Sequence, residues 1–259
     1  MAPGSSKQRS AIVTGGGSGI GAATAKRLVA DGFAVTLSGR TKDKLDAVAS
    51  EIGSAGEVLT VTADVAKPEA CRDLVNAHVE RFGGLDVLVN NAGVAVGGRV
   101  DNVDDDAWAN VMRVNVDGVF YMTRAAVPSL ERDGGGAIIN VSSVSGLGGD
   151  WGMSPYNASK GAVSNFTRAI ALDLPSRGIR VNAVAPSFTR TDMTKRMQRN
   201  DALMTKFQDR IPMGRGAEPE EVADVIAFLA GHDARFVNGV ILPVDGGLSA
   251  SSGQPNFFN

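Results

Sequence analysis

Short apolar runs alternate with amphipathic stretches along most of the chain, and this alternation predicts parallel β-α-β units. The apolar runs predict strands at 11–15, 33–39, 57–64, 85–93, 136–143, 179–186 and 239–247. Helical periodicity predicts one helix that ends near Asp31 and others at 42–52, 68–82, 114–131, 154–174 and 219–231. The order predicts a single α/β domain over residues 10–247, with a doubly wound sheet of seven parallel strands and helices on both faces.

Three segments fall outside this alternation. Residues 1–9 are expected to form a flexible N-terminal tail, and residues 248–259 a C-terminal tail. The polar, methionine-rich stretch 187–216 is long enough to form a mobile lid. Because Phe257 and Phe258 are aromatic residues in an otherwise polar tail, we expect them to dock on a neighbouring subunit.

Composition and charge argue against several classes of function. Apolar residues make up 43% of the chain, but no run approaches the roughly 18 residues that a membrane span needs. The 26 basic and 28 acidic residues are well mixed, which argues against a nucleic-acid partner. The single cysteine, Cys71, and the lack of an apolar signal near the N-terminus predict a reducing, cytoplasmic location. His78 and His232 are too few to predict a metal site.

A glycine-rich segment, TGGGSGIG (14–21), follows the first predicted strand and opens the first helix. Its glycines let the backbone approach a pyrophosphate, which the N-terminus of the helix then binds. The spacing differs from the general Gly-x-Gly-x-x-Gly pattern, so a plain tight turn is the alternative. Polar residues at the other strand ends favour a ligand site, because the carboxyl ends of parallel strands share one edge of a sheet. These residues are Thr14, Arg40, Asp64, Asn91, Ser143 and Pro186, with Thr189 and Thr191 after it.

The segment SPYNASK (154–160) places Tyr156 and Lys160 on the same face of a helix, because they are four positions apart. Ser154 is predicted to be the N-cap of this helix and Pro155 its first residue. An ammonium group beside a phenol favours the phenolate, which would suit the pair to proton exchange. A solvated surface pair is the alternative, and the segment alone does not decide between them.

Together these motifs resemble the short-chain dehydrogenase/reductase family over about Ser10 to Gly247. TGGGSGIG matches the family's Thr-Gly-x-x-x-Gly-x-Gly cofactor loop, NNAG (90–93) its strand-four motif and YNASK its Tyr-x-x-x-Lys. Ser143 stands at the family spacing of the catalytic serine before Tyr156, and Asn115 matches the asparagine of the catalytic tetrad. The resemblance implies a Rossmann-type fold and an oxidoreductase that interconverts a carbonyl group and a secondary alcohol.

The resemblance also implies a role for each member of the tetrad Asn115, Ser143, Tyr156 and Lys160. Tyr156 would be the general acid in carbonyl reduction and the base in alcohol oxidation. Lowering the pKa of a tyrosine from about 10 to about 7 needs roughly 4 kcal/mol, and Lys160 and the positive nicotinamide ring are the expected sources. Ser143 would donate to the substrate oxygen, and Asn115 would hold a water that connects Lys160 to solvent.

The cofactor is expected at the glycine loop and the strand ends. Gly39 stands where a carboxylate would bind the ribose 2′-hydroxyl of NAD, and Arg40 suits a 2′-phosphate, so NADP(H) is favoured over NAD(H). The alternative is that Arg40 only stacks on the adenine, because no basic residue in the glycine loop reinforces a phosphate site. The expected cofactor-binding residues are Thr14, Gly15, Gly17, Ser18, Gly19, Ile20, Gly21, Arg40, Asp64, Val65, Asn91, Ala92, Gly93, Tyr156, Lys160, Pro186, Thr189 and Thr191.

The expected substrate is a small or medium ketone or secondary alcohol. Its pocket is predicted within 145–153 and 187–210, where methionine and aromatic side chains form an adaptable wall. The candidates are Ser143, Trp151, Met153, Phe188, Met193 and Met197. Packing of the lid onto the core is the alternative for the apolar ones. Ser187 replaces a glycine that relatives often carry, which leaves the local shape of the loop open.

Several members of the family share these motifs. A 3-oxoacyl carrier-protein reductase would need a basic docking patch, which Arg190, Lys195, Arg196 and Arg199 can supply. An NAD-dependent sugar or alcohol dehydrogenase is also compatible. A non-catalytic cofactor-binding sensor is disfavoured because the tetrad is complete. The family's usual homotetramer is expected here as well.

Overall fold

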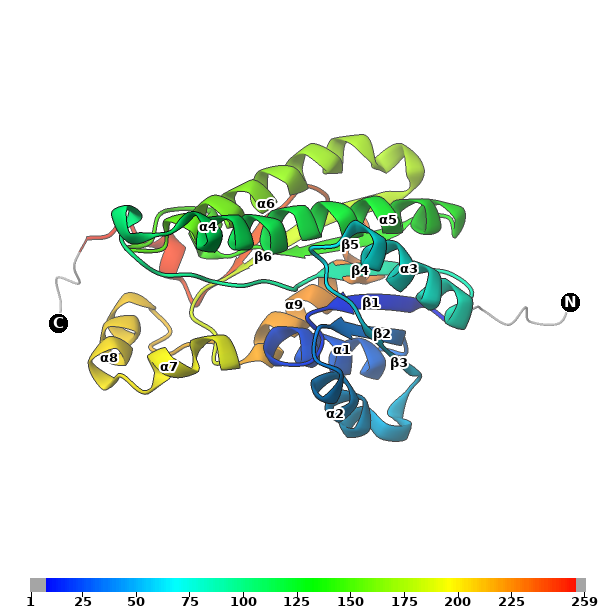
Figure 1. Ribbon diagram of the computed structural model, residues 1–259, viewed down its shortest axis with the longest axis horizontal. Helices are drawn as coiled ribbons and strands as arrows, with labels where there is room; N and C mark the ends of the chain where they lie inside the picture. Colours follow the sequence, from blue (N-terminus) through cyan, green and yellow to red (C-terminus); the bar gives the residue numbers. More distant parts are fainter. Residues whose placement is uncertain (1–7, 255–259) are drawn as a thin grey trace, which may run out of the picture.

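A sheet of seven parallel strands lies between two layers of helices in the computed structural model, which describes residues 8–254 (Figure 1). The strands are β1 (Ser10–Thr14), β2 (Ala34–Gly39), β3 (Val58–Thr62), β4 (Val87–Asn90), β5 (Gly136–Val141), β6 (Ile179–Pro186) and β7 (Ile241–Val244). They follow the order β3-β2-β1-β4-β5-β6-β7, and every neighbouring pair is parallel. The predicted doubly wound fold is therefore confirmed.

The helices connect successive strands and cover both faces of the sheet. They are α1 (Gly19–Ala30), α2 (Lys42–Ile52), α3 (Pro68–Phe82), α4 (Asp105–Met112), α5 (Gly118–Arg132), α6 (Ser154–Asp173), α7 (Lys195–Gln198), α8 (Asp201–Arg210) and α9 (Pro219–Ala230). Between α4 and α5 the chain forms a π-helical turn, η3 (Arg113–Asp117).

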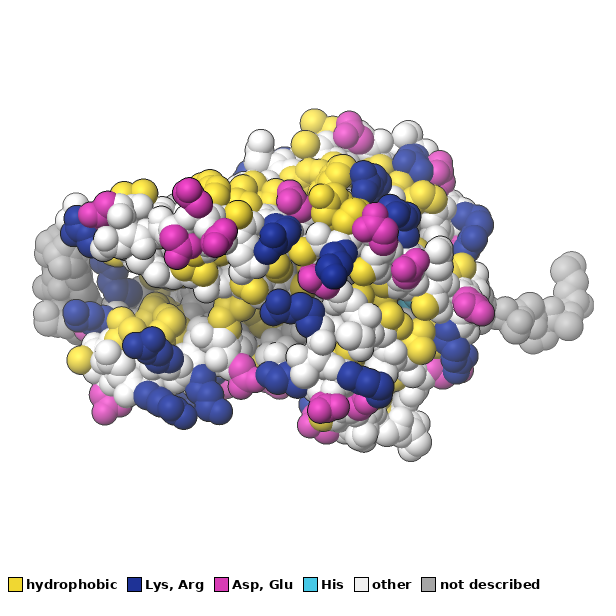
Figure 2. Space-filling model, viewed as in Figure 1, with side chains coloured by type: hydrophobic (Ala, Val, Ile, Leu, Met, Phe, Trp, Pro, Cys, Tyr) yellow, Lys and Arg dark blue, Asp and Glu magenta, His cyan; other side chains and the backbone are white. Residues whose placement is uncertain are grey.

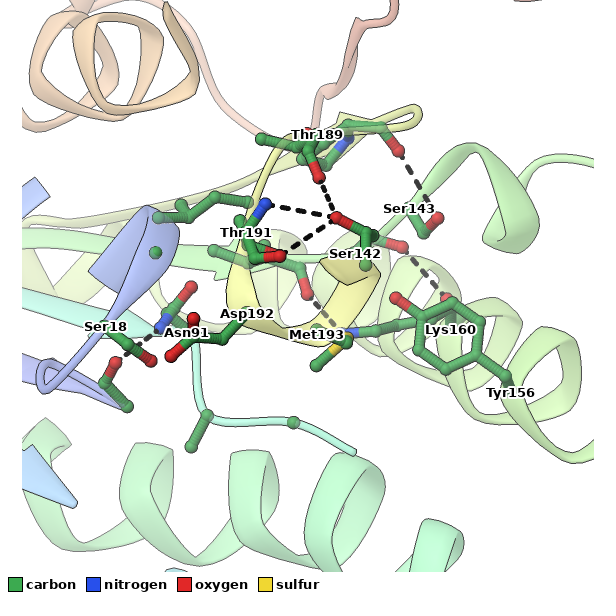
Figure 3. Close-up of a pocket in the computed structure, with 18 of the residues that line it drawn as sticks. Ser18, Asn91, Ser142, Ser143, Tyr156, Lys160, Thr189, Thr191, Asp192 and Met193 are labelled. Carbon is green, nitrogen blue, oxygen red and sulfur yellow. Dashed lines mark hydrogen bonds between the residues drawn. The ribbon is translucent and has the colours of Figure 1, made fainter. Parts of the chain in front are cut away.

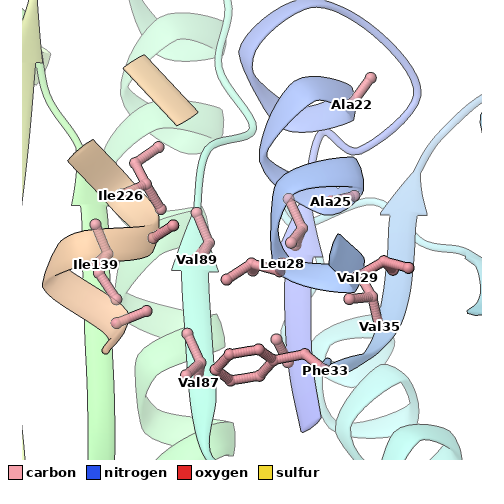
Figure 4. Packing of buried hydrophobic residues seen from close by; sticks show 14 of the residues in the cluster. Ala22, Ala25, Leu28, Val29, Phe33, Val35, Val87, Val89, Ile139 and Ile226 are labelled. Carbon is pink, nitrogen blue, oxygen red and sulfur yellow. The ribbon is translucent and has the colours of Figure 1, made fainter. Parts of the chain in front are cut away.

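Successive residues of the central strands face opposite helical layers, which gives the protein two apolar cores. Val89 belongs to the core under α1, α2 and α9 (Figure 4), whereas its neighbour Leu88 belongs to the core under α3, α5 and α6. Because both faces are covered, a strand such as β1 is buried at every residue. This explains why the strands are continuous apolar runs in the sequence rather than alternating ones.

Two parts of the chain are more helical than the sequence indicates. The sequence predicts no helix between the fourth strand and about Val114, but α4 begins at Asp105, where the carboxylate of Asp104 accepts a hydrogen bond from the N–H of Ala107. The segment 187–216 contains α7 and α8. The prediction of Ser154 as an N-cap is wrong, because Ser154 is the first residue of α6 and follows Met153 at the cap.

The ends of the chain are described only in part. Gln8 and Arg9, expected in the flexible tail, contact the domain instead. The guanidinium of Arg9 lies 4.3 Å from the ring centroid of Phe33 and donates to the carbonyl oxygen of Ala230 at 2.9 Å. Residues 1–7, and the expected docking residues Phe257 and Phe258, lie outside the described residues.

The surroundings of Cys71 and His78 indicate structural roles for both side chains. Cys71 is buried, and burial raises the pKa of its thiol to about 11, so it is a poor nucleophile. The buried ring of His78 is hydrogen-bonded to the hydroxyls of Thr36, at 2.7 Å, and Ser10, at 3.1 Å. Residues 8–254 contain no cluster of three or more His, Cys, Asp or Glu side chains suited to a metal ion. No helix within that range is both long and apolar enough for a membrane span.

Candidate active site

A cavity of about 240 Å³ opens at the carboxyl edge of the sheet, where the order of the strands reverses between β1 and β4 (Figure 3). The glycine loop, the end of β4, the end of β5, the start of α6 and the lid (187–216) all contribute to its wall. Of the predicted site residues, it contains Gly15, Ser18, Gly19, Ile20, Asn91, Ala92, Gly93, Ser143, Tyr156, Lys160, Pro186, Thr189, Thr191 and Met193. The fold thus brings most of the predicted residues together.

The glycine loop is shaped by contacts with the end of β4. The side-chain amide of Asn91 donates to the carbonyl oxygens of Thr14, at 2.9 Å, and Gly15, at 3.2 Å. The hydroxyl of Thr14 accepts from the backbone N–H groups of Asn91 and Ala92. Gly21 packs so closely that an added Cβ would lie 2.2 Å from the carbonyl oxygen of Gly15. These contacts hold the loop against β4, so Thr14 acts behind the cavity wall.

The chain provides a cradle for a pyrophosphate at the start of α1. Gly15 and Gly19 adopt positive φ angles of 65° and 52°, which glycine tolerates far better than other residues. Ser18 is extended and makes no side-chain cap to the first turn of α1. The first amides of the helix and its dipole therefore point toward the cavity without a competing side-chain acceptor from Ser18. These residues fit a dinucleotide cofactor.

The residues predicted for the adenosine end of the cofactor lie outside the cavity wall. Arg40 is exposed just beyond β2. The carboxylate of Asp64 accepts from the N–H of Ala66 at 3.1 Å, so it stabilises a turn. Val65 is buried against Gly118, where an added Cβ would lie 2.8 Å from the valine side chain. Their contacts with a cofactor remain predictions.

Gly17 brings an unpredicted basic residue to the glycine loop. A Cβ at Gly17 would lie 3.0 Å from the Cβ of Lys44, on the first turn of α2. The ammonium group of Lys44 lies 3.3 Å from the carboxylate of Asp192, in the lid. Lys44 was missed because it belongs to the next β-α unit, although it stands only four positions after Arg40 in the sequence.

Tyr156 and Lys160 lie in the first two turns of α6, as predicted. Lys160 is buried, its ammonium group donates to the carbonyl oxygen of Val141 at 2.7 Å, and its Nζ lies 5.6 Å from the ring centroid of Tyr156. Burial lowers the pKa of Lys160 to about 8, because the charged form loses hydration. Lys160 therefore titrates near physiological pH.

In the protein without cofactor the pKa of Tyr156 is raised, whereas the prediction was a lowered pKa in the complex with an oxidised nicotinamide. Burial of the phenol raises it, a hydrogen bond with Ser143 acts in the opposite sense, and the charge of Asp150 raises it further. Desolvation of the phenolate is the largest contribution, and burial is not visible in a sequence. The groups of the protein alone therefore favour the phenol, and the lowering expected from an oxidised nicotinamide remains a prediction.

Asn115 connects the end of β4 with α6 from within the π-helical turn η3. Its side-chain oxygen accepts from the N–H of Val94 at 2.8 Å, and its amide donates to the carbonyl oxygen of Val94 and to Ser159. Ser159 in turn donates to the backbone carbonyl oxygen of Tyr156 at 2.8 Å. The side chain of Asn115 is thus committed to protein partners, and its contact with a water remains a prediction. π-Helical turns are frequent at functional sites.

Only two of the six candidate pocket residues, Ser143 and Met193, belong to the cavity wall. The ring of Phe188 stacks on Phe207 with centroids 4.6 Å apart, so it holds the lid instead. Trp151 is fully exposed, and Met153 contacts the position of Gly97. Met197 lies on α7, away from the wall.

The sequence interpretation missed the wall residue Ser142, and within the predicted segment 187–210 it did not name Ser187, Asp192 and Thr194 as site residues. Ser142 is adjacent to Ser143, and its hydroxyl donates to the backbone carbonyl oxygen of Lys160. Thr194 donates to the carbonyl oxygen of Thr189 at 2.7 Å and closes a turn of the lid. The serine pair was the one available signal for Ser142, whereas the turn of the lid depends on tertiary packing.

Basic side chains gather on the surface over α7 and α8 (Figure 2). Lys195 and Arg196 lie on α7, and Arg199 follows its end; all three are exposed. Arg190 instead pairs with Glu218, at 3.0 Å. Of the four residues of the predicted basic patch, three are therefore exposed without that pairing to Glu218, and the charge of the fourth, Arg190, is partly neutralised by Glu218.

Comparison with known proteins agrees with this geometry. A family described as enoyl-(acyl carrier protein) reductase matches residues 15–249. The chain is 46% identical to a meso-2,3-butanediol dehydrogenase of Serratia marcescens, over 94% of this chain and 96% of that protein. It is 39% identical to a 3-oxoacyl-[acyl-carrier-protein] reductase of Thermotoga maritima, over 92% of this chain and 96% of that protein. The crystal structure of levodione reductase matches with a TM-score of 0.90 and 34% identity, over 94% of this chain and 98% of that chain.

Proposed function

The chain belongs to the short-chain dehydrogenase/reductase family, and on this basis we propose that it transfers a hydride between NADP(H) and a small ketone or secondary alcohol. It is an oxidoreductase that acts on CH–OH groups. The observation that carries the proposal is the placement of Ser143, Tyr156 and the buried Lys160 in one cavity with the glycine loop.

A bound nicotinamide would supply the hydride-transfer chemistry, and the protein would orient the substrate and move its proton. Tyr156 would give its proton to the substrate oxygen during reduction and take one during oxidation. Ser143 would hold the same oxygen by a hydrogen bond. Lys160, with its charge buried beside the tyrosine, would favour the phenolate when it is protonated.

Substitution of Tyr156 by phenylalanine tests this assignment. The Tyr156→Phe variant should lose turnover by a factor of about 10³ while the cofactor still binds, because only the proton-transferring hydroxyl is removed. Tyr121→Phe is the matched control, since the chain has two tyrosines, and it should retain the wild-type rate. Retention of turnover in Tyr156→Phe would refute the assignment.

The preference for NADP(H) is supported by Arg40 and by the position of Gly39, which carries no carboxylate to repel a 2′-phosphate. Lys44 adds a second basic group beside Gly17. Arg40→Ala should raise the Kd for NADPH about tenfold and leave the Kd for NADH unchanged. Lys42→Ala, which removes an ion pair with Asp46 on the surface of α2, is the control. Tighter binding of NADH than NADPH by the wild-type protein would contradict the preference.

The substrate class is supported by the size of the cavity and by similarity to the butanediol dehydrogenase. A small hydroxyketone or vicinal diol should therefore be turned over faster than a bulky alcohol. Carrier-protein reduction is the second candidate, because the exposed bases of α7 lie beside the cavity. A comparison of butane-2,3-diol and its hydroxyketone with an acetoacetyl thioester, with and without a carrier protein, separates the two. A rate that depends on the carrier protein would favour the second candidate.

We further propose a cytoplasmic homotetramer. Large apolar side chains at the surface support an assembly, notably Phe236, which is fully exposed, and Leu172, which is 84% exposed. Phe228 on α9 is also exposed, beside the last strand of the sheet. Light scattering at micromolar concentration tests the proposal, and a monomer under these conditions would contradict it.

A further inference from the structure

Ser145 is bonded through all three of its polar groups, although neither the sequence motifs nor the tetrad include it. It lies in the short turn η4 (Val144–Gly146) after β5 and is only 7% exposed. Its N–H donates to the hydroxyl of Ser143 at 3.2 Å, and its carbonyl oxygen accepts from the amide of Asn157 at 2.9 Å. Its hydroxyl donates to the carboxylate of Asp150. The side chain is therefore held in a single orientation between the tetrad serine and a carboxylate.

The bond to Asp150 fixes the direction of the next hydrogen bond. An ionised carboxylate only accepts, so the single proton of the Ser145 hydroxyl points to Asp150. The oxygen of Ser145 is then left to accept from the hydroxyl of Ser143, 3.1 Å away. The carbonyl oxygen of Pro186, at 3.3 Å, and the phenol oxygen of Tyr156 are further acceptors near Ser143. The orientation of the Ser143 hydroxyl thus depends in part on Ser145 and Asp150, neither of which lines the cavity.

We propose that Ser145 and Asp150 are positioning residues for the reaction: they hold the oxygen of Ser143 beside Tyr156, its proton turns from Ser145 to the substrate oxygen when a substrate binds, and they link this site to a carboxylate at the protein surface. Asp150 is exposed, whereas Ser143 and Ser145 are buried, so this series of hydrogen bonds runs from the cavity to solvent. The proposal rests on the proposed function, because that function gives Ser143 and Tyr156 their roles.

The charge of Asp150 gives the proposal a measurable signature. It raises the pKa of Tyr156, so its removal should lower that pKa. The other charged groups near the start of α6 are Lys160 on the same helix and Asp192 on the lid across the cavity, while Arg168 and Asp173 lie farther along α6. The π-helical turn η3 and α4, which pack against α6, carry Arg113, Asp117, Asp105 and Asp106. Among the acidic groups, Asp150 is the one whose charge raises the pKa of Tyr156.

The first experiment measures the phenol directly and needs no turnover. In a Tyr121→Phe background, Tyr156 is the sole tyrosine, so the ultraviolet absorbance of tyrosinate reports its ionisation. Adding Asp150→Asn should lower the midpoint by about 0.5 pH unit, the order expected for one charge across a partly solvated gap. The matched control is Glu80→Gln, an exposed acid on α3, which should leave the midpoint unchanged. An unchanged midpoint in Asp150→Asn would overturn the proposal.

The second experiment measures coupling between the two positioning residues in a complete enzyme. Ser145→Ala and Asp150→Ala should each lower kcat about tenfold with the Kd for the cofactor unchanged, because both loosen the same Ser143 hydroxyl. The kcat of the double variant should be at most about twofold lower than that of the slower single variant. Asp150→Asn keeps an acceptor for Ser145, so it should retain most of kcat while the acid limb of the oxidation profile moves to lower pH.

The outcomes test the positioning role and the proposed function separately. Effects of Ser145→Ala and Asp150→Ala that multiply in the double variant, or a pH profile of Asp150→Asn that superimposes on that of the wild type, would overturn the positioning role. Absence of turnover in the wild-type protein would refute the proposed function instead, and the phenol titration would still decide whether Asp150 acts on Tyr156.

Discussion

Two regions meet at the cavity and are built by different means. We call the first the cradle; it comprises residues 14–21, 90–94, 141–145 and 154–160. Its polar groups are bonded to one another, as in the contacts of Asn91 with the glycine loop and of Lys160 with Val141. The second is the lid, in which neither α7 nor α8 contains a buried residue. The two ends of the lid are anchored by the buried residues Phe188, Thr189 and Ile211, and α7 and α8 by the stack of Phe188 on Phe207 and by exposed ion pairs.

This difference assigns separate tasks to the two regions. A change in the cradle disturbs several buried partners at once, so the geometry for hydride and proton transfer is fixed there. A change in the lid removes few contacts, and segments with few buried contacts open at low free-energy cost. We therefore propose that the lid adapts to the substrate and opens for product release, while the cradle stays constant.

The sharpest test of this contrast exchanges one glycine in each region for alanine. A Cβ at Gly21 would lie 2.2 Å from the carbonyl oxygen of Gly15 and 2.5 Å from the amide nitrogen of Asn91, so the glycine loop would have to move. We expect Gly21→Ala to weaken cofactor binding about 100-fold, or close to 3 kcal/mol. Calorimetric titration with the preferred coenzyme measures the effect.

The matched variant in the lid is Gly214→Ala. Gly214 has a φ of 71° but nothing within 4 Å of an added Cβ. Its cost is backbone strain of about 1 kcal/mol, with no change in the Kd for the cofactor. Equal losses of cofactor affinity in the two variants would contradict the division between cradle and lid.

The same contrast explains what the sequence could and could not predict. The residues of the cradle could be predicted because short motifs specify them. Gly21 is required by a close backbone contact, and Tyr156 and Lys160 are placed together by their helical spacing. The placement of Phe188 was not, because its partner Phe207 lies on a helix of exposed residues with no strong pattern. The direction of the Tyr156 pKa shift was also out of reach, since it follows from burial.

The buried charge of Lys160 provides the second test. Its pKa of about 8 in the folded protein lies below its ordinary value of 10.5, so the unfolded chain binds more protons between these pH values. Stability therefore rises with pH across that window, and the full cost of the buried charge is present below pH 8. Lys160→Met should abolish turnover yet stabilise the protein at pH 7 by about 2 kcal/mol, after allowance of about 1 kcal/mol for the lost hydrogen bond to Val141.

Denaturant unfolding at a series of pH values checks this prediction. The difference in stability between Lys160→Met and the wild type should shrink as the pH rises from 8 toward 10. A variant that is less stable than the wild type at pH 7, with a constant difference across the series, would show that the charge is compensated within the cradle.

A smaller effect is expected when the anchor of the lid is removed. Phe207→Ala deletes the ring that stacks on Phe188, and such ring pairs contribute about 0.5–1.5 kcal/mol beyond their buried area. We expect the KM for the substrate to rise severalfold, with the Kd for the cofactor within twofold of the wild type. Asp209→Ala, an exposed change on the same helix, is the control. An equal loss of cofactor affinity in Phe207→Ala would mean that the lid is part of the cofactor site.

The smallest effect concerns the ion pair between the lid and Lys44, which lies on α2 beside Gly17 of the cradle. Lys44 and Asp192 are 55% and 60% exposed, so the pair should contribute no more than about 0.5 kcal/mol to stability. The pair should instead affect cofactor binding, because a 2′-phosphate near Gly17 would compete with Asp192 for the ammonium group of Lys44. Asp192→Asn should therefore lower the Kd for NADPH about twofold without changing the Kd for NADH, and added salt should reduce the difference. A change of equal size for both coenzymes would mean that Lys44 senses the lid and not the phosphate.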